Sequence, residues 1–374
     1  MNQETVEQAV AYYRELLLSQ IARAQNMNSA PAAEKKEKTV IALIDGDGIG
    51  PIIMTQTRRV LEKLLADEIA QGTVELRPIE VLTIENRLAL GKSVPGEVLD
   101  AIKQCDVLLK GPTTTPSGGT MESANVTLRR ELDLFANVRP VSVPALGIDW
   151  TFFRENTEGE YTLGSKGIEF PGLLTMDFKV ITEEGTRRIA KAAFDFAKAN
   201  GKNRVTVVTK SNIMKKTDGM FSRICNEVAA EYPGITVDEY YIDIMAANLV
   251  NPAIRADFQV FVLPNLYGDI ITDEAAQIQG GVGTAGSANV GSRYAMFEAI
   301  HGSAPRMIAD GLADYASPES LMQAAVLLLR HIGLAEKADR LAAAIERAAA
   351  SVRVTGTREG HTCAEFGDAV SAAL

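Results

Sequence analysis

Two aspartates in the second half of the chain have the spacing of metal ligands. The stretch FQVFVLPNLYGDIITD, residues 258–273, begins as an apolar run of strand length and turns into a helical pattern after Pro264. Asp269 and Asp273 stand at positions i and i+4, so a helix places both carboxylates on one face. Their repulsion would cost about 0.2–0.5 kcal/mol, and Mg²⁺ or Mn²⁺ would turn that cost into binding. Alternatively, the two acids only complement the helix dipole.

Two further side chains stand where a predicted strand ends. Lys210 follows the buried run Val205–Val208, and Asp243 closes the predicted strand Val237–Asp243. A lysine at the carboxyl end of a strand, near a cleft, is well placed for acid–base chemistry, although taken alone it is equally a surface residue. Asp243 is a third candidate carboxylate for a metal.

Three arginines precede these groups along the chain. Arg129 belongs to a predicted helix that also carries Ser123 and Asn125, and Arg139 and Arg154 follow it. Aimed at one cleft, three guanidinium groups would hold a multiply charged carboxylate through bidentate hydrogen bonds. Taken singly, each arginine is instead a solvated surface charge.

Composition restricts the classes of protein to which the chain can belong. Its 374 residues predict about two to three domains, and 46% hydrophobic with 23% charged residues is ordinary for a soluble globular protein. A net charge of −10 argues against a nucleic-acid partner, and no apolar run reaches the roughly 18 residues of a membrane span. Three scattered cysteines indicate a reducing compartment without structural zinc, and no segment is typical of a secretory or transit signal. We therefore expect a cytoplasmic protein.

Alternating strand and helix patterns predict an α/β fold. The apolar run Thr39–Ile44 is typical of a buried parallel strand. DGDGIGP follows at residues 45–51 and does not match G-x-G-x-x-G, so a Rossmann fold is not predicted. A helix is expected from Ile52 to Ala70 and an exposed strand over Leu173–Ile181.

An additional helix is predicted before this pattern. Apolar residues recur at helical spacing over Glu4–Ala24, and Asn26–Lys38 is typical of a polar linker. We expect this helix to pack on its own domain or on a partner subunit rather than on a membrane.

Seven motifs run in order from about Thr39 to the C-terminus and resemble those of one enzyme family. They are DGDGIGP, LRRELDLFANVRP, RENTEGEY, TKSNIMKKTDGMF, PNLYGDIITDEAAQIQGG, FEAIHGSAP and LLRHIGL. Together they are similar to the β-decarboxylating dehydrogenases, the isocitrate and isopropylmalate dehydrogenase family. The sequence Ser123-Ala-Asn125 resembles the isocitrate branch, because the isopropylmalate branch usually places a larger apolar residue there.

The resemblance implies that Ser123 and Asn125 contact the γ-carboxylate of isocitrate. Three arginines would bind its other carboxylates: Arg129, Arg139 and Arg154. The nicotinamide cofactor would lie along a further set of residues: Asn289, His301, Gly302, Ser303 and Ala304. NAD-using relatives usually carry an aspartate where this chain has Arg306, and an arginine suits a 2′-phosphate. We therefore expect NADP rather than NAD, with Arg306 and Arg358 as phosphate contacts.

The same resemblance implies a shared catalytic site. Asp269 and Asp273 would ligate Mg²⁺ or Mn²⁺ together with Asp243 of the partner subunit. Lys210, also supplied by the partner, would pair with Tyr161. A metal chelated by isocitrate would acidify the substrate hydroxyl, whose proton goes to Lys210 or to an aspartate. Tyr161 would protonate the carbon that loses CO₂.

The implied fold is the two-domain α/β fold of this family, with a discontinuous large domain. We expect residues 38–134 and 279–374 in the large domain, and residues 135–278 in a small domain with the dimerisation segment. Residues 1–37 would form the helical extension and linker. The expected assembly is a homodimer or a higher homo-oligomer. Two other functions remain open: a related dehydrogenase of 3-isopropylmalate, homoisocitrate or tartrate, and a non-catalytic regulatory subunit.

Overall fold

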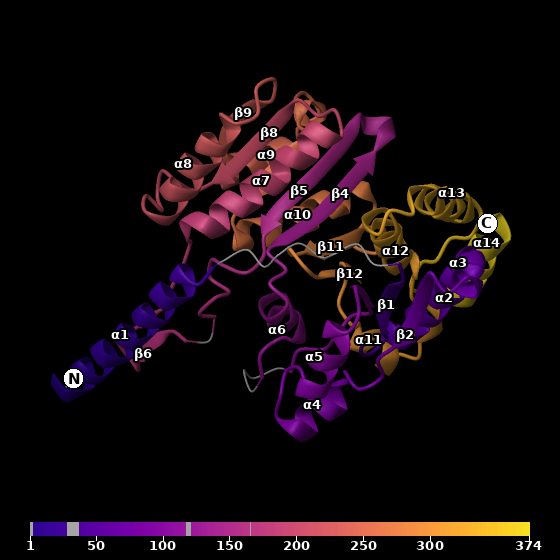
Figure 1. The fold of residues 1–374 in the computed structure, drawn as a ribbon, viewed down its shortest axis with the longest axis horizontal. Helices are drawn as coiled ribbons and strands as arrows, with labels where there is room; N and C mark the ends of the chain where they lie inside the picture. Colours follow the sequence, from indigo (N-terminus) through magenta and orange to yellow (C-terminus); the bar gives the residue numbers. More distant parts are fainter. Residues whose placement is uncertain (1–2, 28–36, 117–120, 165) are drawn as a thin grey trace. The chain divides into compact units, whose positions relative to one another are not determined.

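The chain folds into two compact units, each built from two chain segments (Figure 1). The computed structural model describes residues 3–27, 37–116, 121–164 and 166–374. Unit 1 comprises Met1–Pro31 and Trp150–Ile271, and unit 2 comprises Ala32–Asp149 and Thr272–Leu374. The domain boundaries expected from the sequence differ from the boundaries of these two units, and they stay a prediction.

Within its described residues, unit 2 contains six strands in the order β2, β1, β3, β12, β11, β4. Their bounds are β1 Thr39–Ile44, β2 Val74–Pro78, β3 Val107–Lys110, β4 Ala136–Val143, β11 Gly286–Val290 and β12 Ala295–Ala299. Strands β2, β1, β3 and β12 run parallel, whereas β11 pairs antiparallel with β12 and with β4. In this register Lys110 and Glu298 are partners at the carboxyl ends of β3 and β12.

Helices cover both faces of the unit 2 sheet. Ile41 and Leu43 face a core that α2, α12, α13 and α14 complete, while Ala42 and Ile44 face a second core with α5 and α6. This alternation explains why the first strand is apolar at successive positions, as in other strands buried on both faces. The helices are α2 Gly50–Leu64, α3 Ala66–Ala70, α4 Ile84–Leu90, α5 Gly96–Lys103, α6 Ala124–Glu131, α11 Pro305–Ala309, α12 Glu319–His331, α13 Ala335–Ser351 and α14 Cys363–Ala373.

Unit 1 is built on parallel strands in the order β5, β10, β8, β9. Their bounds are β5 Ile148–Glu155, β8 Arg204–Thr209, β9 Thr236–Tyr241 and β10 Val260–Leu263. The accompanying helices are α7 Glu183–Ala199, α8 Thr217–Ala229, α9 Ile242–Val250 and the beginning of α10, Asn265–Gln279. Phe152 stacks on Phe261 with ring centroids 4.3 Å apart, and Trp150 meets both rings edge-on. This aromatic core holds β5 and β10 in register, so that the residues after both strands form one edge.

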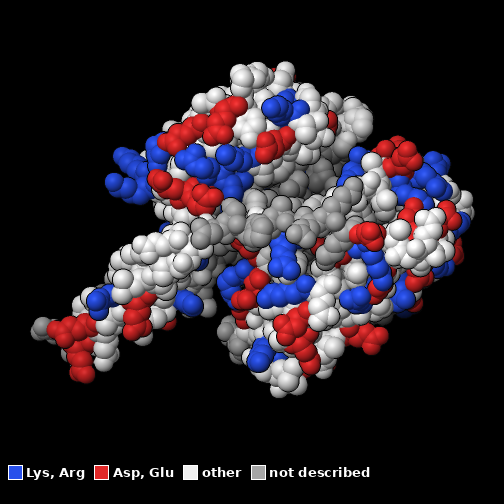
Figure 2. Space-filling view, viewed as in Figure 1, with Lys and Arg blue, Asp and Glu red and all other residues white. Residues whose placement is uncertain are grey.

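The N-terminal helix α1, Gln3–Gln25, packs on unit 1 and exposes much of its apolar surface. Leu16 is buried, and the Tyr13 ring lies 5.3 Å from that of Phe178. Val10 is 61% exposed and Leu18 52% exposed, and Figure 2 shows mostly uncharged surface along the helix, with acidic side chains near its N-terminal end. In the same unit, β6 Ile168–Phe170 and β7 Leu174–Met176 form an antiparallel hairpin. None of the described helices has the length and apolar character of a membrane span.

Three element predictions differ from the structure. The helix expected over Ile52–Ala70 begins at Gly50 and is divided at Leu65 into α2 and α3. The strand expected over Leu173–Ile181 is limited to β7, because the residues after it pair only through the bridge between Gly159 and Val180. The strand expected to end at Asp243 ends at Tyr241, and Asp243 lies in the first turn of α9.

Candidate functional site

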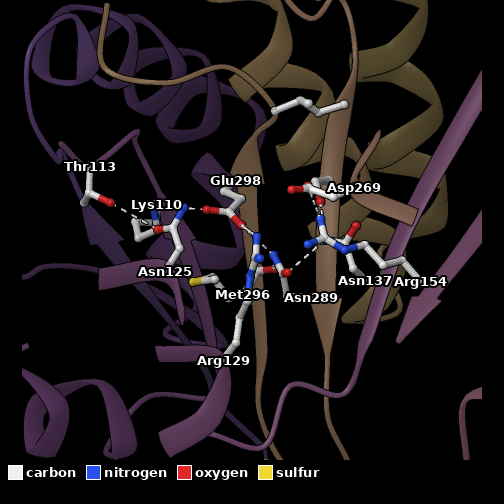
Figure 3. A network of polar contacts seen from close by, with 12 residues as sticks. Lys110, Thr113, Asn125, Arg129, Asn137, Arg154, Asp269, Asn289, Met296 and Glu298 are labelled. Carbon is white, nitrogen blue, oxygen red and sulfur yellow. Dashed lines mark hydrogen bonds and ion pairs between the residues drawn. The ribbon is translucent and has the colours of Figure 1, made fainter. Parts of the chain in front are cut away.

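In unit 1, Arg154 and Asp269 form the centre of a polar cluster. Arg154 is the last residue but one of β5 and is buried, and its guanidinium donates to Asn265 Oδ1 from Nε at 3.0 Å and from Nη2 at 2.7 Å. Its Nη1 pairs with the carboxylate of Asp269 on α10, as Figure 3 shows. Gly268 makes this close approach possible, because a Cβ there would lie 2.5 Å from Arg154 Cγ.

Tyr161 reaches the same carboxylate. Its hydroxyl donates to Asp269 Oδ2 at 2.6 Å, and the guanidinium of Arg154 lies 5.4 Å from the centre of its ring. The structure therefore brings together a predicted catalytic residue, a predicted metal ligand and a predicted substrate-binding arginine. Asn265, which aligns Arg154, was not among the sequence candidates, although the break after Leu263 in PNLYGD marks its position.

Lys210 and Asp243 form a second polar pair in unit 1. Lys210 Nζ donates to Asp243 Oδ1 at 2.5 Å, and this hydrogen bond lowers the pKa of Asp243. The backbone N–H of Lys210 donates to the buried carboxylate of Asp218 at 2.7 Å, which fixes the chain at the end of β8. The Asp243 side chain is 61% exposed and that of Lys210 26% exposed. Both groups are therefore accessible from outside the subunit.

A polar pocket in unit 2 collects several of the remaining candidates. It encloses about 400 Å³ of empty space that is partly open to solvent. Its predicted substrate and cofactor residues are Asn125, Arg129, Arg139, His301 and Gly302. Thr113 also lines it and donates to Asn125 Oδ1 at 3.1 Å. Ser123 stands at the N-cap position of α6, two residues before Asn125.

A buried ion-pair network includes two residues that line this pocket, Arg129 and Glu298 (Figure 3). Glu298 accepts from Arg129 Nη2 at 3.1 Å, and Lys110 Nζ lies 3.1 Å from its other oxygen. Burial alone would raise the pKa of Glu298, but the charges of Lys110 and Arg129 outweigh it and hold the pKa at about 2. Burial lowers the pKa of Lys110 against the pull of Glu298. The low pKa of Glu298 keeps its carboxylate charged at neutral pH.

Lys110, Glu298 and Asn137 were not identified as site residues from the sequence. Each of the two charged residues ends an apolar strand segment, DVLLK and AMFE, and that terminal charge is the signal that could have revealed them. Asn289, a predicted cofactor residue, is fully buried and belongs to the same network. Its Nδ2 donates to Glu298 Oε1 at 2.9 Å, and its Oδ1 accepts from Asn137 at 2.9 Å.

Arg139 and Asp273 meet in unit 2. Arg139 Nη1 donates to Thr272 Oγ1 at 2.6 Å and to Asp273 Oδ1 at 3.0 Å, while the Asp273 side chain remains 60% exposed. Within the described residues, no group of three or more His, Cys, Asp and Glu side chains could hold a metal ion. The metal set of Asp243, Asp269 and Asp273 therefore stays a prediction that requires a second chain.

The predicted cofactor loop is anchored to the glycine-rich loop after β1 and to the segment after β3. Ser303 Oγ hydrogen-bonds Thr114 Oγ1 at 2.7 Å, and its carbonyl accepts from the N–H of Ile49 at 3.1 Å. A Cβ on Gly48 would lie 2.0 Å from that carbonyl, so this contact needs glycine. Ala304 takes a left-handed conformation with φ of 47° just before α11. The turn directs the chain from His301 into α11, and burial lowers the pKa of that histidine.

The two predicted phosphate-binding arginines lie in unit 2, Arg306 on α11 and Arg358 in the loop between α13 and α14. The Arg306 side chain is 93% exposed and pairs with Asp310 at 3.5 Å. A Cβ on Gly311, which follows Asp310, would lie 3.9 Å from Arg358 Nη2. This contact places Arg358 beside the segment that carries Arg306.

Comparison with known proteins extends over most of the chain. The family model described as isocitrate/isopropylmalate dehydrogenase matches residues 40–370. Isocitrate dehydrogenase [NADP] of Rickettsia prowazekii is 42% identical over 79% of this chain and 60% of its own length, so the chain spans about three fifths of that relative. The probable isocitrate dehydrogenase [NAD] subunit alpha, mitochondrial, of Drosophila melanogaster is 37% identical over 93% of this chain and 92% of its own.

The chain is also similar to a 3-isopropylmalate dehydrogenase and to a protein of known crystal structure. The chloroplastic 3-isopropylmalate dehydrogenase of Solanum tuberosum is 40% identical over 86% of this chain and 88% of its own. The crystal structure of isocitrate dehydrogenase from Methylococcus capsulatus superimposes with a TM-score of 0.79 at 34% identity, covering 90% of this chain and 99% of that one. The chain therefore belongs to the isocitrate/isopropylmalate dehydrogenase family, and it carries that family's α/β fold with an additional N-terminal helix.

Proposed function

We propose that this protein oxidises isocitrate to 2-oxoglutarate and CO₂ with reduction of NAD(P). The observation that carries this proposal is the polar lining of the unit 2 pocket. Asn125 and Thr113 are hydrogen-bonded to each other there, and Arg129 and Arg139 line the same pocket. Amide, hydroxyl and guanidinium groups suit a third carboxylate, whereas an isopropyl group would offer them no hydrogen bond.

The arginines supply the binding energy for the substrate in this proposal. Arg129, Arg139 and Arg154 would bind the carboxylates of isocitrate, and Ser123 and Asn125 its γ-carboxylate. Each guanidinium is already aligned by a carboxylate: Glu298, Asp273 or Asp269. Such preorganisation lowers the entropy lost when a bidentate hydrogen bond to the substrate forms.

We propose that Asp269 and Asp273, together with Asp243 of the partner subunit, hold Mg²⁺ or Mn²⁺. The donor set fits, because carboxylate oxygens are the ligands that these hard cations prefer. A bound ion supplies Lewis-acid chemistry at the substrate's hydroxyl and carboxylate oxygens. Without an ion, the positive charge of Arg154 holds the carboxylate of Asp269 in place, and that of Arg139 holds the carboxylate of Asp273.

Proton transfer is assigned to Lys210 and Tyr161. We propose that Lys210 in its neutral amine form, or an aspartate, takes the proton of the substrate hydroxyl, directly or through water, while hydride passes to NAD(P). Tyr161 would then donate its phenolic proton to the carbon that has lost CO₂. The hydrogen bond from Tyr161 to Asp269 supports this role, because it fixes the direction of the phenol.

A homodimer is part of the proposal. Lys210 and Asp243 are paired with each other, and the Asp243 side chain is 61% exposed. Supplied to a second copy, this pair would complete the acid–base and metal groups that begin with Tyr161 and Asp269. An isolated subunit would then be inactive.

A substrate panel tests the proposal. We would measure kcat/KM for isocitrate, 3-isopropylmalate, homoisocitrate and tartrate, each with NAD and NADP and with Mg²⁺, Mn²⁺ or a chelator. Isocitrate with a divalent ion should exceed the other acids by at least about a hundredfold, the discrimination expected of a site built to bind a polar group. Preference for 3-isopropylmalate, homoisocitrate or tartrate would replace the proposal by the related activity. Absence of turnover with all four acids would favour a regulatory subunit.

Two variants sharpen the test. Asn125→Leu should shift the ratio of kcat/KM toward 3-isopropylmalate, because the change replaces a polar wall by an apolar one. Asn226→Leu makes the same substitution at an exposed position of α8 and should leave the ratio unchanged. An equal ratio in both variants would show that Asn125 does not face the distinguishing group of the substrate.

A further inference from the structure

We propose that Arg23 of the N-terminal helix is a positioning residue for the segment that carries Tyr161. The effect of Arg23 on kcat rests on the proposed function, whereas its effect on the structure of the segment does not. Arg23 Nη2 lies 3.1 Å from Glu158 Oε1, and the Glu158 side chain is 2% exposed. Arg23 itself is held by Gln20, whose Oε1 accepts from Arg23 Nε at 2.8 Å. The ion pair therefore joins α1 to the RENTEGEY segment, residues 154–161.

Glu158 links two helices of unit 1. Its carboxylate accepts from the hydroxyl of Thr182 at 2.6 Å and from the N–H of Thr182 at 2.8 Å, and Thr182 is the N-cap of α7. A Cβ on Gly185 would lie 2.5 Å from Glu158 Cδ, so the carboxylate is tightly enclosed. An anion is favoured at the N-terminus of α7 and a cation in the last turn of α1. Glu158 and Arg23 satisfy both preferences with one contact.

The backbone at Glu158 connects this contact to the catalytic cluster. The carbonyl of Glu158 accepts from Asn265 Nδ2 at 3.0 Å, and the same Asn265 aligns Arg154 through its Oδ1. Gly159 pairs with Val180 in both directions, at 2.7 and 3.1 Å. Tyr161 follows two residues later and donates to Asp269. A shift of Glu158 would therefore be transmitted both to Arg154 and to the phenol of Tyr161.

A second buried carboxylate, that of Glu155, explains why residues 154–161 need a positively charged side chain nearby. Glu155 Oε2 accepts from the N–H of Glu158 at 2.6 Å, and Glu155 is 2% exposed. Burial and the charge of Glu158 raise the pKa of Glu155 to about 7. Arg188 of α7 and Arg23 of α1 face this carboxylate pair. Without Arg23, two adjacent buried carboxylates would share less positive charge, and an uncompensated buried charge is strongly unfavourable.

The experiment compares Arg23→Gln with Arg14→Gln, which removes the same charge from an exposed position of α1. Amide hydrogen exchange of residues 155–163, followed by mass spectrometry, should become faster in Arg23→Gln and remain at the parent rate in Arg14→Gln. This readout does not depend on any activity. Failure of the proposed function would appear separately, as a parent protein without isocitrate turnover.

Kinetics give a second, charge-specific readout. Arg23→Gln should lower kcat about tenfold at pH 8.5, because the ion pair with Glu158 is lost, with a smaller change in KM for isocitrate. The loss should shrink toward pH 6, because the carboxylate pair then holds a proton and needs less positive charge. Arg23→Lys should restore most of kcat. When Arg23→Gln is combined with Glu158→Gln, the amide hydrogens of residues 155–163 should exchange more slowly than in Arg23→Gln alone.

Three outcomes would overturn the proposal. One is unchanged exchange of residues 155–163 in Arg23→Gln. Another is a loss of kcat of equal size at every pH, which would indicate general loosening of α1. The third is equal behaviour of Arg23→Gln and Arg14→Gln in both measurements.

Discussion

The hydroxyl of Tyr161 donates a hydrogen bond to Asp269 at 2.6 Å, and the same carboxylate pairs with Arg154. One side chain on α10 thus holds both a proposed proton donor and a proposed substrate ligand. If Asp269 also binds a divalent cation, the phenol and the guanidinium must share this carboxylate with the ion. Metal binding, substrate binding and protonation would then be coupled through a single residue, and substitutions around it should affect different steps.

Asp269→Asn should abolish metal-dependent turnover while the protein stays folded. The amide removes one anionic ligand and one partner of Arg154, so binding of Mn²⁺ should weaken by at least about tenfold, corresponding to roughly 1.4 kcal/mol. Mn²⁺ binding, followed by electron paramagnetic resonance, measures this directly, and turnover at saturating isocitrate and limiting Mg²⁺ measures its effect. Asp257→Asn, at an exposed position of the same unit, is the matched control. Parent-like Mn²⁺ binding and turnover in Asp269→Asn would remove Asp269 from the metal set.

Lys210→Met and Tyr161→Phe should fail at different steps. Loss of the lysine removes the proposed proton acceptor and should slow the oxidation of isocitrate. Loss of the phenol should spare the reduction of oxalosuccinate more than overall decarboxylation, because protonation comes after CO₂ has left. Measuring both partial reactions in both variants checks this assignment. Equal losses in the two reactions would contradict separate roles.

Much of the arrangement could be predicted from the sequence because the chemistry depends on local motifs. Asp269 stands in a helix turn, Tyr161 follows β5 and Arg154 lies near the end of that strand, and the structure brings the three together. Lys110 and Glu298 were not predicted as site residues, because the motifs that surround them do not reveal that β3 and β12 are paired neighbours in the sheet. That pairing is a property of the sheet order, and sheet order depends on long-range packing.

The contact of Arg23 with Glu158 illustrates the same limit. The apolar spacing over Glu4–Ala24 predicts a helix, and the structure has one from Gln3 to Gln25. Spacing within a helix gives no information on which distant segment its last turn will contact. Asp243 was misplaced for a related reason, since the alternation of TVDEYYID continues past the point where β9 ends and α9 begins.

Glu298→Gln should lower the free energy of unfolding at neutral pH. It should also make that free energy fall less steeply as the pH is lowered. The pKa of Glu298 is held at about 2 against an ordinary value of 4.5. A carboxylate with a lowered pKa stabilises the fold fully above pH 4.5 and loses that contribution as the pH falls toward 2. The difference corresponds to on the order of 3 kcal/mol. Urea unfolding between pH 2.5 and 7, followed by circular dichroism, measures it.

Glu131→Gln is the control for this prediction, because Glu131 is exposed at the end of α6 and pairs only loosely with Arg130, at 3.5 Å. It should leave the pH dependence of the unfolding free energy nearly unchanged. If Glu298→Gln also retained the parent's slope between pH 4.5 and 2.5, the ion pair with Lys110 would not carry the acid sensitivity of unit 2.

The preference for NADP over NAD should depend on Arg306. Its guanidinium is 93% exposed, its contact with Asp310 is 3.5 Å long, and Arg358 lies on the neighbouring loop. An exposed arginine offers a 2′-phosphate two parallel hydrogen bonds and offers the ribose hydroxyls no acceptor. We therefore expect the parent to prefer NADP. Arg306→Asp should reverse the preference, because a carboxylate accepts hydrogen bonds from ribose hydroxyls and repels the phosphate.

The ratio of kcat/KM for NADP to that for NAD measures this preference. A charge-assisted bidentate contact contributes roughly 1.5–3 kcal/mol, so Arg306→Asp should change the ratio by about ten- to a hundredfold. Arg293→Asp makes the same change of charge at an exposed position of unit 2 and should leave the ratio at the parent value. Arg358→Ala should lower the ratio in the same direction as Arg306→Asp, by a smaller factor. A parent that prefers NAD, or a ratio that Arg306→Asp does not move, would show that Arg306 does not bind the 2′-phosphate.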